Sequence, residues 1–136
     1  MIVDTSALVA VAYREPGYEP IRDALLSESG RISAPVLVEF HRVTSLDGNR
    51  PNPEAVLVIE SFTSAQIEIV PFGIAAAMVA VDANPVHGSG NGRGGRLNML
   101  DLMVYGMAKV DGLPILFTGK DFPLTDAQLH PASRLW

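Results

Sequence analysis

The sequence predicts an α/β sandwich built around a small, mainly parallel sheet. Short apolar runs of strand length alternate with longer segments of helical period, and this alternation is typical of parallel sheets covered by helices. The chain has 136 residues, 48% of them hydrophobic, which suits one domain with a substantial core. The sequence has no internal repeat, coiled-coil heptad or domain linker, so residues 1–136 are expected to form a single domain.

The first third of the chain alternates apolar runs with residues that start or stop helices. Thr5 or Ser6 would cap the first helix, Gly30 would end the second, and Pro35 suits the first turn of the third. The predicted elements are a strand over 1–4, helices over 6–13 and 19–29, a strand over 31–34 and a helix over 35–46.

The remainder of the chain contains two segments with loop composition, 47–53 and the glycine-rich 84–96. Beyond Gly119 we expect loop and at most one short edge strand. The other predicted elements are helices over 54–65, 74–82 and 98–110 and strands over 67–70 and 114–117.

The composition restricts the chemistry and the location that we expect. The chain has no cysteine, which fits a reducing cytoplasm and leaves only oxygen or imidazole ligands for a metal ion. Asp4 stands where a secretory leader needs positive charge, and the apolar run 74–81 is far shorter than the ~20 residues that cross a bilayer. We therefore expect neither a leader nor a membrane span.

Four acids lie in or directly after apolar segments, where a solvated carboxylate is unusual. Because the carboxyl ends of parallel strands meet at one edge of a sheet, we expect their side chains to converge. Each has a simpler alternative, namely a helix cap at the first and third, a pair with a core arginine at the second and a turn at the last. The four acids are Asp4, Glu39, Asp101 and Asp121.

Glu39 illustrates the pattern, since a helical projection from Val36 places it inside an apolar arc. The arc also holds Phe40, Val43 and Leu46, and the opposite face holds His41, Arg42 and Ser45.

Convergence of these carboxylates would require a cation. Two carboxylates ~4 Å apart repel by roughly 4 kcal/mol at an effective dielectric constant near 20. Mg²⁺ or Mn²⁺, which prefer oxygen ligands, would remove this repulsion. Zinc is disfavoured because the three histidines show no ligand spacing. The net charge of −5 argues against nucleic acid only if no such cation binds, and it would also attract a basic protein partner.

The chain resembles the PIN-domain ribonucleases, and most closely the VapC toxins of bacterial VapBC toxin–antitoxin pairs. The resemblance covers essentially the whole chain, with the motifs in the order of the family. It rests on the opening residues 1–8, Glu39, the block 96–101 with Tyr105, Ala108 and Lys109, and the block 116–122 with Thr125 and Asp126. Two positions depart from the family pattern, since Leu100 is usually a small residue and Gly106 is usually Ala.

The resemblance implies a three-layer α/β/α PIN domain and a Mg²⁺- or Mn²⁺-dependent endoribonuclease with Asp4, Glu39, Asp101 and Asp121 as its acidic quartet. Asp4 and Asp101 would be the principal metal ligands, while Thr5 or Ser6 would hydrogen-bond within the site and Asp126 would support it. It also implies an RNA substrate, a VapB-type antitoxin, a homodimer and a cytoplasmic location.

The glycine-rich loop contains a G-x-G-x-x-G pattern at 90–95 that we do not interpret as a dinucleotide site, because a helix and not a strand is predicted before it. Its Arg93 and Arg96 lie beside Asp101 and would instead grip RNA phosphates; a merely flexible connection is the alternative.

Two other functions remain open. One is a PIN-like module that binds RNA or protein without cleaving it. The other is a phosphoryl-transfer domain with Asp4 as nucleophile, which the haloacid-dehalogenase pattern disfavours because Ser6 stands where a second Asp is needed.

Overall fold

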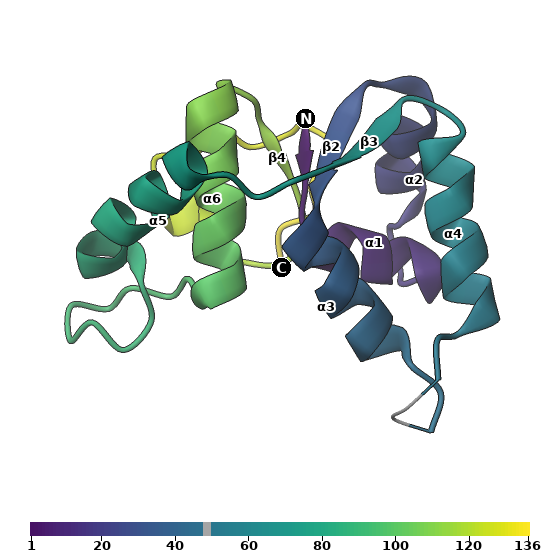
Figure 1. Ribbon diagram of the computed structural model, residues 1–136, viewed down its shortest axis with the longest axis horizontal. Coiled ribbons are helices and arrows are strands. Elements are labelled where there is room, and N and C mark those ends of the chain that lie inside the picture. The colour runs from purple at the N-terminus through teal and green to yellow at the C-terminus, as the bar shows by residue number, and fades with distance from the viewer. Residues whose placement is uncertain (48–49) are drawn as a thin grey trace.

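The computed structural model describes residues 1–47 and 50–136 (Figure 1). Part of the loop predicted over 47–53, Gly48 and Asn49, lies outside the described residues. Helices and strands alternate as predicted. The elements are β1 (Ile2–Val3), α1 (Thr5–Ala12), α2 (Glu19–Ser27), β2 (Gly30–Ser33), α3 (Ala34–Thr44), α4 (Pro53–Thr63), β3 (Ile67–Val70), α5 (Ile74–His87), α6 (Met99–Asp111), β4 (Ile115–Leu116) and a 3-10 turn, Phe122–Leu124.

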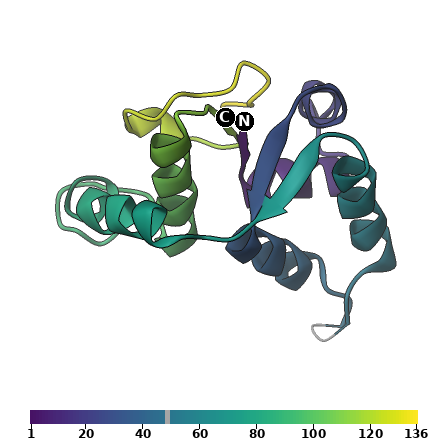
Figure 2. The same ribbon diagram turned by 45° about the horizontal axis from the view of Figure 1, so that its top comes forward.

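Within the described residues, four parallel strands form one sheet in the order β3-β2-β1-β4. Helices α5 and α6 lie on one side of this sheet, and α1, α2 and α4 lie on the other (Figure 1). A second view shows β2 and β3 running side by side (Figure 2). The predicted sandwich with a parallel sheet is therefore confirmed.

The central strand is fully enclosed. Ile2 and Val3 are inaccessible to solvent, as are Leu116 of β4 and Ile32 of β2. Strands that are covered on both faces consist of continuous apolar residues, and such runs predicted these strands from the sequence.

The chain after Gly119 returns to pair with β4. The backbone amide of Ile115 donates to Gln128, that of His130 donates to Ile115, and that of Gly119 donates to Arg134. These bonds make a short irregular parallel edge, in agreement with the edge strand expected there.

Two predicted helix ends were wrong. Asp4, and not Thr5 or Ser6, caps α1, since its carboxylate accepts the backbone N–H of Ser6. Helix α5 continues past 82 to His87, with Pro85 inside it. Pro85 removes one hydrogen bond to the carbonyl of Val81, and this loss is tolerable because Val81 is exposed to water.

The apolar arc predicted for the helix around Glu39 is also partly wrong. Val36 and Phe40 are buried as expected, but Val43 is exposed and Leu46 lies beyond the end of α3. Thr44 takes the buried position because its hydroxyl donates to the carbonyl of Phe40. Across the described residues, no helix is long and apolar enough to cross a membrane.

Candidate functional site

Asp4 stands where β1 runs into α1. Its backbone amide donates to the carbonyl of Leu116 at 2.9 Å, so the strand pairing fixes its position. Its carboxylate accepts the backbone N–H of Ser6 at 2.9 Å and also the Ser6 hydroxyl. Asp4 is only 6% exposed, and this burial raises its pKa, while the hydrogen bonds from Ser6 oppose the rise.

Two hydroxyls connect the acids to neighbouring elements. The Ser6 hydroxyl, besides donating to Asp4, accepts the backbone N–H of Thr118 at 3.0 Å and so ties the segment after β4 to the start of α1. The Thr5 hydroxyl donates to Glu39 on α3 at 2.5 Å. Both hydrogen bonds agree with the expectation that Thr5 or Ser6 would bond within the site.

Asp101 lies in the first turn of α6 and belongs to a capping box whose N-cap is Asn98. Its carboxylate accepts the backbone N–H of Asn98, and the Asn98 side chain accepts the backbone N–H of Asp101. The pKa of Asp101 is raised to about 7, chiefly by burial and then by the negative charges of Asp4, Asp121 and Glu39, while the hydrogen bond from the Asn98 backbone opposes the rise. The charges of Asp4, Asp121 and Glu39 therefore act on the Asp101 carboxyl group.

Asp121 lies on the segment after β4, where one Arg96 nitrogen approaches its carboxylate to 4.0 Å. Both side chains are about half exposed. The structure thus places Arg96 beside Asp121. Arg93 lies on the exposed glycine-rich loop, and no ion pair joins it to an acid among the described residues.

The four carboxylates are not packed as a closed cluster, since no three histidine or acidic side chains in 1–47 and 50–136 are spaced to hold an ion. Mutual repulsion opposes a closer approach when nothing neutralises the charge. The donor set nevertheless fits a hard divalent cation, because it consists of carboxylate oxygens, two of them on groups whose pKa is raised by burial.

Asp126 faces a different set of partners. It accepts the Tyr105 hydroxyl at 2.7 Å and the Lys109 ammonium at 2.8 Å, and His87 lies 3.7 Å away. These donors lower the pKa of Asp126 to about 2. Asp126 therefore fixes the chain downstream of Asp121 to α6. Sequence analysis missed Lys109 as its partner, although the spacing of Tyr105 and Lys109 by four residues would have placed both on one helix face.

Comparison with known proteins identifies the class. Residues 1–128 match the family model of the PIN domain. Ribonuclease VapC42 of Mycobacterium tuberculosis is 37% identical over 134 residues, covering 97% of this chain and 98% of that protein. Ribonuclease VapC30 of the same organism is 34% identical and covers 93% of this chain and 95% of that protein. The chain therefore belongs to the PIN domain family, in its VapC group, as the sequence motifs predicted.

Solved structures agree in fold. Mycobacterium tuberculosis VapC20, described as a Sarcin-Ricin loop cleaving toxin, superposes with a TM-score of 0.71 at 15% identity, covering 93% of this chain and 95% of that chain. A DNA-bound VapBC from Salmonella typhimurium gives 0.61 at 21% identity, covering 99% and 95%.

Proposed function

We propose that this protein is a Mg²⁺- or Mn²⁺-dependent endoribonuclease toxin that a VapB-type antitoxin neutralises. The observation that carries the proposal is the sheet order, which places Asp4 after β1 and the segment of Asp121 after the adjacent β4, while Glu39 is hydrogen-bonded to Thr5 beside Asp4. The raised pKa of Asp101 agrees with this arrangement. Repulsion between acids brought together in this way lowers the stability of the metal-free protein. A function that requires a bound cation explains why the chain has them. The VapC relatives, which are named ribonucleases, support RNA as the substrate.

In the proposed mechanism, Asp4 and Asp101 are the principal ligands, and Glu39 and Asp121 complete the shell or orient water. The bound cation would supply an activated water and would neutralise charge on the phosphodiester. Thr5 holds the Glu39 carboxylate, and Ser6 holds that of Asp4, so that both acids keep their orientation. Arg96, beside Asp121, and Arg93 on the loop would bind the RNA phosphates.

The test is cleavage of a single-stranded RNA by purified protein with Mg²⁺, with Mn²⁺ or with EDTA. We expect cleavage with a cation, none with EDTA, and none by a folded Asp4→Asn variant. Glu60→Gln, which removes an exposed acid from α4, is the matched control and should cleave normally. Binding of RNA without cleavage under every condition would favour the inactive binding module instead.

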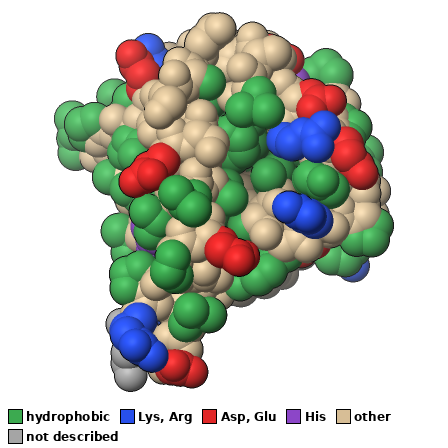
Figure 3. Space-filling view, turned by 90° about the vertical axis from the view of Figure 1, so that its right-hand side faces the viewer, with side chains coloured by type: hydrophobic (Ala, Val, Ile, Leu, Met, Phe, Trp, Pro, Cys, Tyr) green, Lys and Arg blue, Asp and Glu red, His purple; other side chains and the backbone are tan. Residues whose placement is uncertain are grey.

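For the antitoxin, the structure offers a groove of 710 Å³ between α1, α2 and α4. The space-filling view of this side shows hydrophobic side chains around a hollow, with charges of both signs at its edge (Figure 3). Such a groove suits the apolar face of a partner helix, and the acidic site beyond α1 suits a basic side chain on the partner. The lining residues are Val11, Ala12, Tyr13, Arg14, Tyr18, Arg22, Glu54, Leu57 and Val58.

Leu57→Asp tests this surface, because Leu57 is exposed and lies away from the acids. We expect the variant to cleave RNA normally but to escape neutralisation by the cognate antitoxin. Normal neutralisation of Leu57→Asp would exclude the groove.

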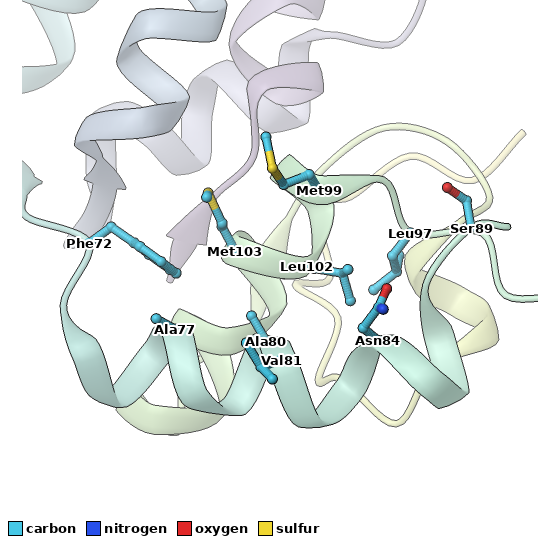
Figure 4. Close-up of a pocket in the computed structure, with 10 residues that line it drawn as sticks. All are labelled: Phe72, Ala77, Ala80, Val81, Asn84, Ser89, Leu97, Met99, Leu102 and Met103. Carbon is cyan, nitrogen blue, oxygen red and sulfur yellow. The ribbon is translucent and has the colours of Figure 1, made fainter. Parts of the chain in front are cut away.

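The proposed homodimer would use the outer face of α5. Ile74, Met78 and Val81 are exposed along one side of this helix, which contains no Lys or Arg. Val81 also lines an apolar hollow between α5 and α6, together with Phe72 and Met103 (Figure 4). A face without positive charge suits a second copy better than RNA. Met78→Arg should convert a dimer to a monomer in light scattering, and an unchanged mass would reject this face. We also propose a cytoplasmic location, where RNA is available.

A further inference from the structure

We propose that Trp136 and Arg134 form a stacking subsite for an unpaired nucleobase of the bound RNA, next to the acidic site. The inference rests on the proposed function for the identity of the ligand. It adds a residue that would bind a base, whereas the acids would bind the cation and the arginines of the glycine-rich loop would bind phosphates.

The position of this pair is set by the chain beside Asp121. The Gly119 backbone amide donates to the carbonyl of Arg134 at 2.9 Å, which pairs the final segment with the segment that carries Asp121. A Cβ added at Gly119 would lie 3.7 Å from the indole nitrogen of Trp136. Gly119 and Asp121 are two residues apart, so their Cα atoms are separated by at most ~7.6 Å. An RNA chain bound at Asp121 would therefore reach the Trp136 indole within a few nucleotides. In both ribbon views the carboxyl terminus lies near the middle of the molecule, beside the sheet (Figures 1 and 2).

The indole is presented as a platform. Trp136 is 72% exposed, and the Arg134 guanidinium lies 5.8 Å from its ring centroid. An aromatic ring that is buried for packing would be covered by apolar neighbours, whereas this ring has a guanidinium beside it and is left open to solvent. Exposed indoles of this kind bind bases by stacking, to which every base contributes a π-face.

The charges around the platform favour RNA over an apolar ligand. Arg134 forms no ion pair with any described residue, so its guanidinium is available for a phosphate. Lys120, next to Asp121, is exposed, and Arg96 approaches Asp121 from the other loop. In a chain with a net charge of −5, these cations are gathered where a polyanion would pass. Because the indole is open to solvent, we expect stacking without strong preference for a particular base.

The chain contains a single tryptophan, which makes the test direct. An Asp4→Asn background prevents cleavage during titration with a single-stranded RNA oligonucleotide. We expect saturable quenching of the tryptophan fluorescence, and weaker quenching by the same sequence as a duplex. In a separate measurement by fluorescence anisotropy of labelled RNA, Trp136→Ala should raise Kd about 5- to 100-fold. Trp136→Phe should recover part of that loss. Leu135→Ala, a neighbouring side chain that is 61% exposed, should leave Kd unchanged.

The outcomes separate this inference from the proposed ribonuclease activity. Quenching by RNA and a weakened Trp136→Ala would support the subsite even if the wild-type protein cleaved nothing. Cleavage by the wild-type protein with no quenching, and an unchanged Kd for Trp136→Ala, would overturn the subsite and leave the nuclease standing. Quenching by the antitoxin but not by RNA would also overturn it, and would assign the indole to a protein interface.

Discussion

At the scale of single residues, the acids carry two functions at once. Asp4 is the N-cap of α1 and Asp101 completes the capping box of α6, and both are proposed here as ligands of the cation. The two interpretations weighed from the sequence, helix cap and site residue, are therefore compatible. A cap fixes the backbone around a carboxylate while leaving its second oxygen available, which suits a residue that must hold its orientation.

Asp101 should make the stability of the metal-free protein depend on pH. Its pKa is raised from 3.8 to about 7 in the folded chain. A carboxyl group with a raised pKa stabilises the fold below its unfolded pKa, and this contribution is lost as pH rises through the folded pKa. The loss amounts to at most roughly 4 kcal/mol. The metal-free protein should therefore become less stable between about pH 4 and pH 7.

The variant Asp101→Asn isolates this effect, because Asn keeps an oxygen for the Asn98 backbone N–H and carries no charge. In EDTA at pH 8 its melting temperature should exceed that of the wild type by several degrees, and the difference should vanish near pH 4. An equal difference at both pH values would show that the charge of Asp101 is not the cause.

At the scale of residues, the sequence singled out the four acids but not their hydrogen-bond partners. A charge inside an apolar run is visible locally, whereas the Thr5–Glu39 and Ser6–Thr118 bonds join residues 34 and 112 positions apart. No local pattern marks such pairs, because the fold that joins them depends on the whole chain.

At the scale of elements, the close packing of α5 on α6 explains one departure from the family pattern. A Cβ at Gly106 would lie 2.3 Å from the carbonyl oxygen of Ala76 and 3.3 Å from the Cβ of Ala80. Glycine at this position therefore lets the two helix backbones approach each other.

Gly106→Ala should accordingly destabilise the protein. Alanine improves helix propensity by about 1 kcal/mol, but the clash with backbone should cost about 1–3 kcal/mol and dominate. Urea unfolding measures the difference, and Val110→Ala on the exposed side of α6 is the control, expected within about 0.5 kcal/mol of wild type. A higher free energy of unfolding for Gly106→Ala would mean that α5 moves to accommodate the methyl group without loss of stability.

The contact between Asp126 and α6 should affect activity more than stability. Its side chain is 64% exposed, so the pair with Lys109 contributes less than about 1 kcal/mol. It nevertheless fixes the segment that follows Asp121. We expect Asp126→Ala to leave the urea midpoint nearly unchanged and to lower kcat about tenfold or more with little change in KM. Equal losses in stability and kcat would indicate a purely structural role.

At the scale of the whole molecule, the parallel sheet is what unites the site. The alternation of strands and helices predicted a parallel sheet, but the order β3-β2-β1-β4 was not predicted, because strand order depends on which crossovers the packed helices allow. That order makes β1 central, with β2 and β4 on its two sides. The ends of these three neighbouring strands are consequently followed by Asp4, by the start of α3 and by the segment of Asp121. The predicted convergence of the acids requires such an arrangement.

The same arrangement predicts that a divalent cation stabilises the protein as a whole. A ligand that binds only the folded chain raises stability by RT ln(1 + [L]/Kd), about 2.7 kcal/mol at a concentration 100 times Kd. Mg²⁺ or Mn²⁺ should therefore raise the melting temperature of the wild type by several degrees in a concentration-dependent way. Asp4→Asn should lose most of this shift, because it removes a principal ligand, whereas Glu60→Gln, with the same change of charge on α4, should keep it. A shift of equal size in all three proteins would mean that the cation only screens the net charge of −5 and that the acids bind no ion.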